Sequence, residues 1–333
     1  MKRLILTTSD SGAGCLKAAR IADQVFGFTH RLVSGPVPPV SDPEAFFVAR
    51  RDLLGEMGDQ EGEVFASSFG RDWLEVVSLC ETVERIEIWP DPCPNAQLQL
   101  IQLVDWLSCY PEIVWKLAFV HSDERIGERR PQDAASLSPQ FQKAGHRQLE
   151  TAKLALRAFQ QSTPQAWFDL LGRDVEALPH LGRTVLRLLK ELPAVDTALG
   201  ATESALLNAV SEGETRPMHV LGNQLWGDPL VVLDYWELGR TLDRLASCKE
   251  PVVLGLDEGP FTSELHSDRA RFERYKASKL SLSELGRALV ENREDFARHN
   301  AIERWWGGTK LTNDRLWRWD RASNALMAPG RPA

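Results

Sequence analysis

The first residues with the chemistry of a binding site follow directly after an apolar segment at the N-terminus. Residues 2–8 favour a strand, and they lead through a short polar turn with glycines into a segment that favours a helix. The free amides and the dipole at the start of a helix attract anions. The candidate ligand-binding residues of this turn are Asp10, Ser11, Gly12 and Gly14. The turn lacks the nucleotide-binding patterns GxGxxG and GxxxxGKS/T, and the alternative is that Asp10 or Ser11 only caps the helix.

A carboxylate and an imidazole follow two further predicted strands. Asp91 comes shortly after an alternating segment at residues 84–89, and His121 comes directly after an apolar segment at residues 113–120. In an open parallel sheet, ligands bind outside the carboxyl ends of the strands. At that edge Asp91 and His121 would form an acid–base pair that acts on a bound ligand. The alternative is that His121 is a surface histidine without a chemical role.

The second half of the chain contains basic residues in a predicted third helix and in the segment that follows it. The candidates for contact with nucleic acid or with a partner protein are Arg240, Arg244, Arg269, Arg271, Arg274 and Lys276. Acidic residues interleave with them, which is also typical of a solvated face. The net charge is −8, and neither half of the chain, divided after Thr197, has an excess of Lys and Arg. Because phosphate neutralisation supplies most non-specific affinity for nucleic acid, this balance disfavours DNA as the partner.

Metal chemistry and membrane insertion are not expected. The five cysteines are dispersed without a CxxC pair, and the seven histidines show no HxxxH or HExxH spacing, so we expect neither a metal site nor a disulfide framework. Cys15, at a predicted helix start, is either an activated thiol or a packing residue. The cysteine usage favours a reducing cytoplasm. No apolar run approaches the roughly 18 residues that span a bilayer, so we expect a cytoplasmic protein without a membrane partner.

Four predicted strands in residues 1–125 would position the first group of candidates. These strands are expected at residues 2–8, 26–33, 84–89 and 113–120, with helical segments between them. Strands that alternate with helices favour a parallel sheet with right-handed crossovers. The sequence therefore predicts an N-terminal α/β domain with a small, Rossmann-like sheet.

The rest of the chain is predicted to be mainly helical. Residues 136–195 are expected to form a helical bridge, whose first helix is capped by Ser138 and runs to about Gln161. Residues 198–325 show three helical segments and then two short strands, which is the order of a winged helix. These segments lie at residues 202–211, 217–225, 233–248, 252–256 and 280–282. The tryptophans of residues 304–320 predict a tryptophan-rich hairpin at the end of this domain.

Six short motifs occur in a fixed order along most of the chain. They are Thr7-Thr8-Ser9-Asp10-Ser11-Gly12-Ala13-Gly14, Gly35-Pro36-Val37-Pro38, Trp89 with Gln97-Leu98-Gln99-Leu100, Glu191-Leu192-Pro193, Thr202-Glu203 and Trp306-Gly307-Gly308. In this order they resemble a bacterial family known only as a domain of unknown function, number eighteen thirty-five. Members of that family place a His-Asp pair before the QLQL helix, whereas this chain has Pro92 and Cys93. The resemblance implies the same architecture and no established activity, and any chemistry of the His-Asp pair would be lost here.

Three functions are compatible with these observations. The first is a ligand-binding regulatory protein, in which the α/β domain binds a small anion and the winged-helix-like domain contacts nucleic acid or a partner protein. The alternative is an enzyme that acts on a phosphorylated or nucleotide-like small molecule at the carboxyl ends of the strands. The third is a scaffold that assembles through the tryptophan-rich hairpin. The sequence identifies neither a cofactor nor an oligomeric state, and fold alone does not choose among the three functions.

Overall fold

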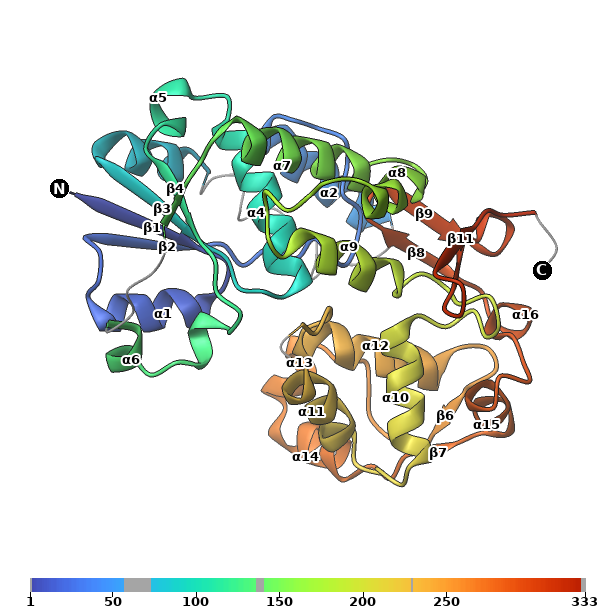
Figure 1. The fold of residues 1–333 in the computed structure, drawn as a ribbon. Helices are drawn as coiled ribbons and strands as arrows, with labels where there is room; N and C mark the ends of the chain where they lie inside the picture. The colour runs from blue at the N-terminus through green and yellow to red at the C-terminus, as the bar shows by residue number, and fades with distance from the viewer. Residues whose placement is uncertain (1, 57–72, 136–140, 229, 331–333) are drawn as a thin grey trace. The chain divides into compact units, whose positions relative to one another are not determined.

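The computed structural model describes residues 2–56, 73–135, 141–228 and 230–330. The chain forms two units, each with its own core (Figure 1). Unit 1 contains residues 1–186 and 305–309, and unit 2 contains residues 187–304 and 310–333. No helix in the described part of the chain has the length and apolar character that crossing a bilayer requires.

Unit 1 is built on a five-stranded sheet with the order β2-β1-β3-β4-β5. The strands are β1 (Arg3–Thr7), β2 (Gln24–Gly27), β3 (Arg85–Trp89), β4 (Leu117–Val120) and β5 (Phe141–Lys143). The first four strands pair in parallel, and β5 pairs antiparallel to β4. The apolar runs at β1, β3 and β4 are buried on both faces, as parallel strands require. The predicted α/β domain with a small parallel sheet is therefore confirmed.

Helices lie on both faces of this sheet (Figure 1). The helices of unit 1 are α1 (Asp10–Ala19), α2 (Pro43–Glu56), α4 (Pro94–Leu107), α5 (Pro111–Val114), α6 (Pro131–Ala135), α7 (His146–Phe159) and α8 (Gln165–Phe168), with the 3-10 turns η1 (Ile126–Glu128) and η2 (Asp169–Gly172). Residues 73–82 are also helical. Helix α1 contacts η1 and α6, whereas α4 contacts α7 on the other face. Helix α9 (Leu181–Leu189) follows at the end of unit 1.

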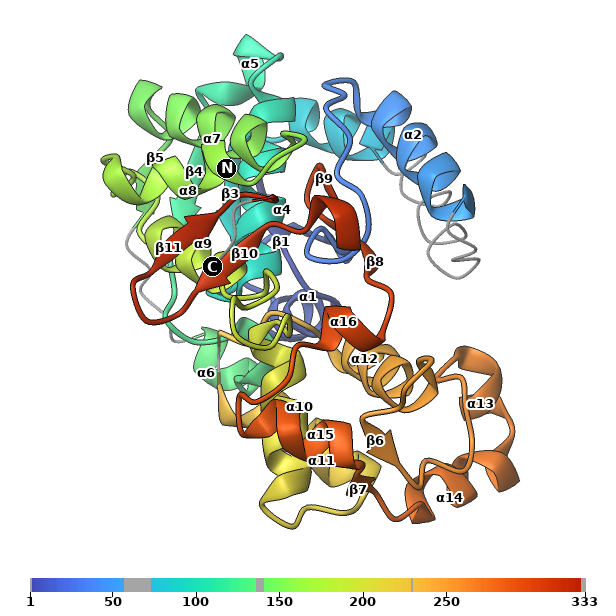
Figure 2. The ribbon, with the colours of Figure 1, turned by 90° about the vertical axis from the view of Figure 1, so that its right-hand side faces the viewer.

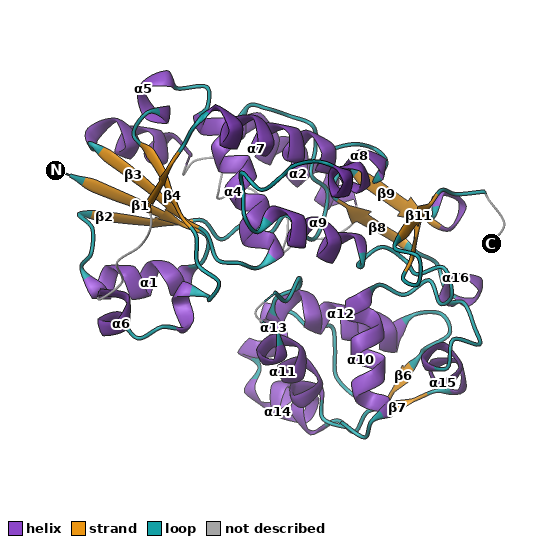
Figure 3. Cartoon of the chain, viewed as in Figure 1, coloured by secondary structure: helices purple, strands orange, loops and turns teal. Residues whose placement is uncertain are grey.

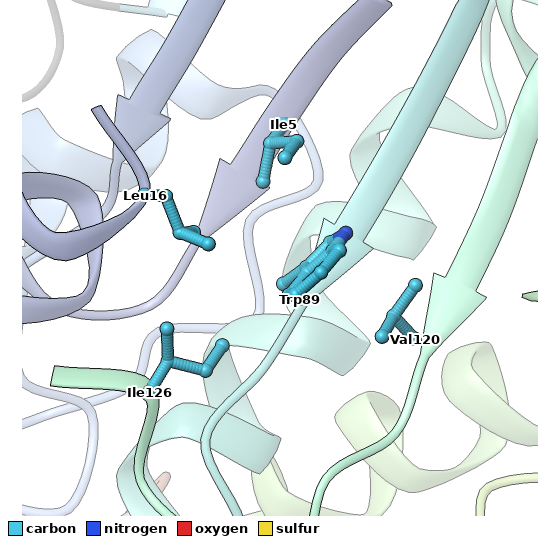
Figure 4. Close-up of a cluster of buried hydrophobic side chains, with 5 residues drawn as sticks. All are labelled: Ile5, Leu16, Trp89, Val120 and Ile126. Carbon is cyan, nitrogen blue, oxygen red and sulfur yellow. The ribbon is translucent and has the colours of Figure 1, made fainter. Parts of the chain in front are cut away.

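A cluster of apolar side chains lies near the carboxyl ends of the strands on the α1 face (Figure 4). Ile5, Trp89 and Val120 come from β1, β3 and β4, whereas Leu16 comes from α1 and Ile126 from η1. All five side chains are almost fully buried. Burial of a large apolar side chain contributes roughly 1.5–3 kcal/mol, so this cluster holds η1 against α1 and the sheet.

Two strand predictions need correction. The second strand was expected over residues 26–33, but β2 ends at Gly27. The Phe28 amide still donates to the Thr7 carbonyl of β1, whereas the amides of Leu32 and Val33 donate to the Asn95 side chain of α4. The fourth was expected over residues 113–120, but β4 begins only at Leu117. The residues before it form α5, which starts at Pro111, and the fixed φ of proline suits the first position of a helix.

Helix α4 is buried along nearly its whole length although it contains several amide side chains. The Asn95 side-chain oxygen accepts the backbone amide of Leu32 at 2.7 Å, and Gln99 Nε2 donates to the His30 carbonyl at 2.6 Å. His30 Nε2 is 2.7 Å from Gln102 Oε1. The amide side chains of α4 thus form hydrogen bonds with backbone groups of the loop after β2, which explains why polar residues lie inside a buried helix.

The predicted long helix from Ser138 to about Gln161 is also corrected. Ser138 lies outside the described residues, and the chain after it forms the edge strand β5, so α7 begins only at His146. Because β5 pairs with β4, its residues are part of the sheet and not of the predicted helix. Gln148 then accepts the Gly145 amide at 3.1 Å and starts α7.

Unit 2 contains the three predicted helices and two very short strands (Figure 3). They are α10 (Ala201–Ser211), α11 (Pro217–Gly227), α12 (Tyr235–Ser247), β6 (Val253–Leu254) and β7 (Ser281–Leu282). Strands β6 and β7 pair antiparallel over two residues each. The segment between them forms α13 (Ser263–Ser267) and α14 (Arg269–Ala277), with Thr262 and Asp268 as their caps. Helices α15 (Glu284–Val290) and α16 (Phe296–His299) follow.

The tryptophan-rich C-terminal segment forms two hairpins, whereas one was expected over residues 304–320 (Figure 2). The first joins β8 (Glu303–Trp306) to β9 (Thr309–Thr312), and the second joins β10 (Arg318–Asp320) to β11 (Ala325–Met327). Gly307 makes the first turn at φ +57°, where glycine is favoured. Trp306 packs on Phe159 in unit 1, and Trp319 is fully buried in unit 2. These two side chains are core residues of their own units.

Candidate functional site

Helix α1 begins with a cap that differs from the predicted one. Ser9, rather than Asp10 or Ser11, is the N-cap, and its hydroxyl accepts the amide of Gly12 at 3.2 Å. Its extended backbone is typical of an N-cap residue. The side chains of Asp10 and Ser11 are exposed. One of the amides that an anion would use is therefore already bound within the turn.

The Asp91 carboxylate lies at this helix start. Its Oδ2 accepts the Ser9 hydroxyl at 2.9 Å, and its Oδ1 accepts the Ile126 amide at 2.8 Å. The Asp91 amide donates to Thr8 Oγ1 at 3.0 Å. Burial raises the pKa of Asp91, and the bonds from Ile126 and Ser9 oppose that rise. Asp91 thus joins β1, β3 and η1 and places its own carboxylate where an anion would meet the helix.

The turn η1 packs closely on the same helix start. A Cβ added to Gly127 would lie 2.1 Å from Ser11 Oγ and 2.9 Å from the Gly12 amide nitrogen, so only glycine fits there. Gly14 is exposed on the helix surface. The close packing of η1 on Ser11 and Gly12 is a structural role for this turn. The predicted role of Asp10, Ser11, Gly12 and Gly14 in ligand binding stays a prediction.

His121 lies directly after β4, as predicted, and its imidazole lies beside that of His180, whereas the Asp91 carboxylate binds Ser9 and Ile126. The pairing of Asp91 with His121 stays a prediction. The two imidazole rings are 6.0 Å apart between centroids at an interplanar angle of 76°. His180 precedes α9, and its carbonyl accepts the amide of Thr184 at 3.0 Å. His180 is 4% exposed, and His121 is partly buried. The structure therefore brings together two histidines from elements distant in sequence.

Three nitrogens of this pair have no hydrogen-bond partner among the described residues. They are Nδ1 and Nε2 of His121 and Nε2 of His180, and all three are buried. Buried polar atoms without partners are rare, and an ion, a water or a catalytic role commonly accounts for them. The Gln142 side chain and the Ser122 backbone are close enough to influence the imidazole pKa values, but they do not form hydrogen bonds of normal geometry with these atoms.

Arg183 determines the proton position on His180. Its Nη2 forms a hydrogen bond with His180 Nδ1. Because a guanidinium can only donate, Nδ1 must be the acceptor, and the proton of the neutral ring is on Nε2. The Nε2–H of His180 is therefore a buried donor on the ring that lies next to His121.

An acidic side chain completes the cluster. Asp123 Oδ1 is 3.2 Å from Arg183 Nη2 and 4.0 Å from His180 Nδ1, and the Asp123 side chain is 85% exposed. An exposed ion pair of this kind contributes roughly 0–1 kcal/mol. The Asp123 carboxylate is thus held only weakly at the guanidinium of Arg183.

Both imidazoles have a depressed pKa. Burial is the largest cause for His121, and the neighbouring His180 adds to it. Burial again dominates for His180, and Arg183 lowers its pKa further, whereas Asp123 and the Ser122 backbone raise it. Since the ordinary value of histidine is near 6.5, both rings are neutral at pH 7. The cluster then carries the positive charge of Arg183 and the negative charge of Asp123.

Sequence reasoning found His121 but missed His180 and Arg183. The available signal was the spacing of these two residues, three apart at the start of a helix, where i and i+3 side chains are neighbours. Nothing in the sequence connects this helix start with the end of β4. Asp91 was paired with His121 because both follow strands, but β3 directs Asp91 to the α1 side.

The predicted partner-contacting residues of unit 2 are mostly matched by carboxylates. Arg271 Nε and Arg274 Nε bind Glu258 at 3.2 and 2.6 Å, and Lys276 binds Glu273 at 2.8 Å. Two residues of the predicted set, Arg240 and Arg244, lie on α12, and Arg244 binds Glu203. The remaining one, Arg269, is the exposed first residue of α14. Their role in binding a partner stays a prediction.

Neither a metal centre nor an activated thiol is formed by the described residues. They contain no group of three or more His, Cys, Asp or Glu side chains that would hold a metal ion. Cys15 lies inside α1 and is buried, and burial raises the pKa of its thiol. Cys15 is therefore the packing residue of the two alternatives.

No family model matches this chain, and no curated protein matches it. The resemblance of the ordered motifs to the family of unknown function accordingly stays a prediction.

Proposed function

We propose that this chain is a ligand-binding regulatory protein, whose unit 1 binds a small oxyanion at His121, His180 and Arg183. The observation that carries this proposal is the Asp123 carboxylate, which sits on Arg183 at 3.2 Å beside buried imidazole nitrogens without partners. An external phosphate or carboxylate that displaces Asp123 would bind the guanidinium in the same way. It would also give the Nε2–H of His180 the acceptor that it lacks.

The charge of the site supports an anion rather than a cation. Arg183 cannot lose its proton, and the His180 tautomer that it imposes presents a donor. Asp123 is the acidic member of the cluster, and its side chain is free to move into solvent because it is 85% exposed. Once Asp123 leaves, the site has a net positive charge and two fixed donors, which suits an oxyanion.

Calorimetric titration of the full chain with inorganic phosphate tests the proposal. We expect saturable binding of phosphate by the wild-type protein. The variant Arg183→Gln should bind phosphate at least tenfold more weakly, because it lacks the guanidinium group that can donate two hydrogen bonds to the anion. The matched control is Arg147→Gln, which removes an exposed arginine of unit 1 that pairs with Asp174. Equal affinity of the wild-type protein and Arg183→Gln would refute the proposed site.

An enzyme is the second candidate, because two imidazoles with unbonded nitrogens are also the parts of an acid–base site. In that case His121 is the base, since the Nδ1 of His180 is already bound by Arg183. The substrate would be a phosphorylated or nucleotide-like small molecule that the same oxyanion site holds. Release of phosphate from phosphate esters, lost in His121→Gln but kept in His146→Gln, distinguishes this candidate from a purely regulatory site.

For unit 2 we propose a winged-helix-like domain that contacts a partner protein rather than nucleic acid. The order of α10, α11 and α12 before the β6–β7 pair supports the fold, although α13 and α14 replace an extended wing. The pairing of Arg271 and Arg274 with Glu258 supports a protein partner, because the shared carboxylate cancels one of the two positive charges and occupies both guanidinium groups. Cross-linking of the full chain in cell extract, with and without phosphate, tests whether a partner binds and whether the ligand controls it.

A further inference from the structure

We propose that the oxyanion enters the site of unit 1 together with a proton, which His121 takes up, so that binding strengthens as the pH falls. This inference rests on the proposed function and adds its regulation. It makes unit 1 a sensor that responds to a ligand and to pH at once.

The surroundings of the two imidazoles assign the proton to His121. His180 cannot take it without cost, because its Nδ1 accepts from Arg183 and a second ring proton would face the guanidinium. His121 has no such neighbour, since both of its nitrogens are without hydrogen-bond partners in the described part of the chain. In the neutral ring one nitrogen of His121 can donate its proton to a ligand oxygen and the other can take up a proton, after which both are donors.

The charged and polar groups around the pair are few. From the start of α9 come His180 and Arg183, from the loop after β4 comes Asp123, and from β5 comes Gln142. The ring of Phe119, on β4, lies 6.1 Å from that of His121 between centroids. Among the described residues no carboxylate influences the pKa of His121, so a bound anion would supply the negative charge that its protonated form lacks there.

Ligand entry changes this balance. An anion beside an imidazole commonly raises its pKa by 1–3 units. In the free protein, burial and His180 hold the pKa of His121 low. His121 is then protonated in the anion-bound protein and neutral in the free protein at any pH between its pKa in the free protein and its higher pKa in the bound protein. Across that range the affinity changes on the order of tenfold per pH unit for each proton taken up.

Sulfate is the appropriate probe, because its own charge does not change between pH 5.5 and 7.5 under ordinary conditions. The full chain is titrated with sulfate by calorimetry at constant ionic strength at both pH values and in two buffers of different ionisation enthalpy. We expect an affinity that is at least tenfold higher at pH 5.5 and an uptake of about one proton per sulfate. We expect His121→Gln to bind sulfate with nearly the same affinity at both pH values. His146→Gln, which removes an exposed histidine of unit 1, serves as the control and keeps the wild-type dependence.

The outcomes separate the two proposals. Sulfate binding of equal strength at both pH values would overturn the proton-linked mechanism and leave the anion site intact. No binding of sulfate at either pH would overturn the anion site itself. A pH dependence that persists in His121→Gln would contradict the assignment to His121. If His121→Gln does not fold, imidazole resonances of the wild-type protein give the same answer, since the pKa of His121 must rise when sulfate saturates the site.

Discussion

The imidazole rings of His121 and His180 lie 6.0 Å apart between centroids and meet at an interplanar angle of 76°. One ring follows the last residue of β4, and the other precedes the first turn of α9. Both belong to unit 1. This arrangement matches the rule that sites of parallel α/β sheets form beyond the carboxyl ends of the strands. The end of β4 positions His121, and the segment that leads into α9 supplies His180, with Arg183 in the first turn of that helix.

Removal of the Asp123 carboxylate should strengthen anion binding. In the free protein this side chain competes for Arg183, and an exposed ion pair contributes roughly 0.2–1 kcal/mol. Asp123→Asn should therefore lower the Kd for sulfate about two- to fivefold at pH 7, as measured by calorimetry. Asp174→Asn changes the net charge equally at an exposed ion pair of unit 1 and should leave the Kd within twofold of the wild-type value. Equal gains in both variants would show a general charge effect rather than competition at Arg183.

His30 should make unit 1 less stable in acid. Its ring is buried beside Gln102, and burial lowers the pKa of His30 to about 4. In the unfolded chain its pKa returns to 6.5, so the stabilisation is complete above pH 6.5 and decreases as the pH falls toward 4. Between pH 7 and 4.5 we expect a loss of about 2–3 kcal/mol from this group. Urea unfolding of wild-type protein and His30→Asn at both pH values measures it. A loss of the same size in His30→Asn would contradict the assignment, and His146→Asn should behave as wild type.

The parallel sheet could be predicted because its strands carry their own signal. The apolar run at residues 2–8 and the alternating segment at residues 84–89, separated by helical segments, indicate strands without any knowledge of distant contacts. The end of β2 could not be predicted in this way. Beyond it, the Asn95 side chain of α4 binds the amide of Leu32. A hydrogen bond between an amide side chain and a backbone group distant in the sequence produces no periodic pattern in the sequence.

The candidate site was predictable only in part for the same reason. His121 was found because it follows a strand, and strand ends are known sites of function. Its neighbour was not found, because His180 lies 59 residues farther along the chain and only the tertiary fold brings the two rings together. Ser9 was overlooked as the cap in favour of Asp10 and Ser11, since Ser and Asp cap helices about equally well and the sequence alone does not choose among the three positions. Local patterns thus gave the element types, and long-range contacts decided which side chains meet.

Asp243 should make unit 2 more stable in acid than at neutral pH. Its Oδ2 accepts the Phe261 amide, but its Oδ1 is buried without a partner among the described residues. Burial raises the pKa of Asp243 to about 6. Because the unfolded value is 3.8, the favourable contribution is complete below pH 4 and is lost as the pH rises through 6.

The variant Asp243→Asn keeps the shape and removes the charge. It should stabilise the protein at pH 7.5 by roughly 1–3 kcal/mol and have little effect at pH 4. Urea unfolding at the two pH values measures the difference. Asp257→Asn, at an exposed position of the same unit, should be neutral at both. A stabilisation by Asp243→Asn that does not depend on pH would contradict the proposed cause.

Glu258 should limit the affinity of unit 2 for nucleic acid. Its carboxylate binds Arg274 Nε at 2.6 Å and Arg271 Nε at 3.2 Å, and these two bonds are the largest causes of its lowered pKa. Glu258→Gln releases both guanidinium groups for phosphate contacts. Each new contact should steepen the dependence of log K on log salt by about 0.9.

Fluorescence anisotropy with a labelled DNA duplex at several salt concentrations measures this effect. We expect weak binding by the wild-type protein and a two- to tenfold higher affinity of Glu258→Gln at low salt, with a salt slope steeper by about 1–2. Glu264→Gln removes an exposed carboxylate from the neighbouring α13 and is the matched control, which should bind as weakly as wild type. If Glu258→Gln and Glu264→Gln behave alike, the arginines of α14 do not form a latent phosphate-binding surface, and Glu258 has only a structural role.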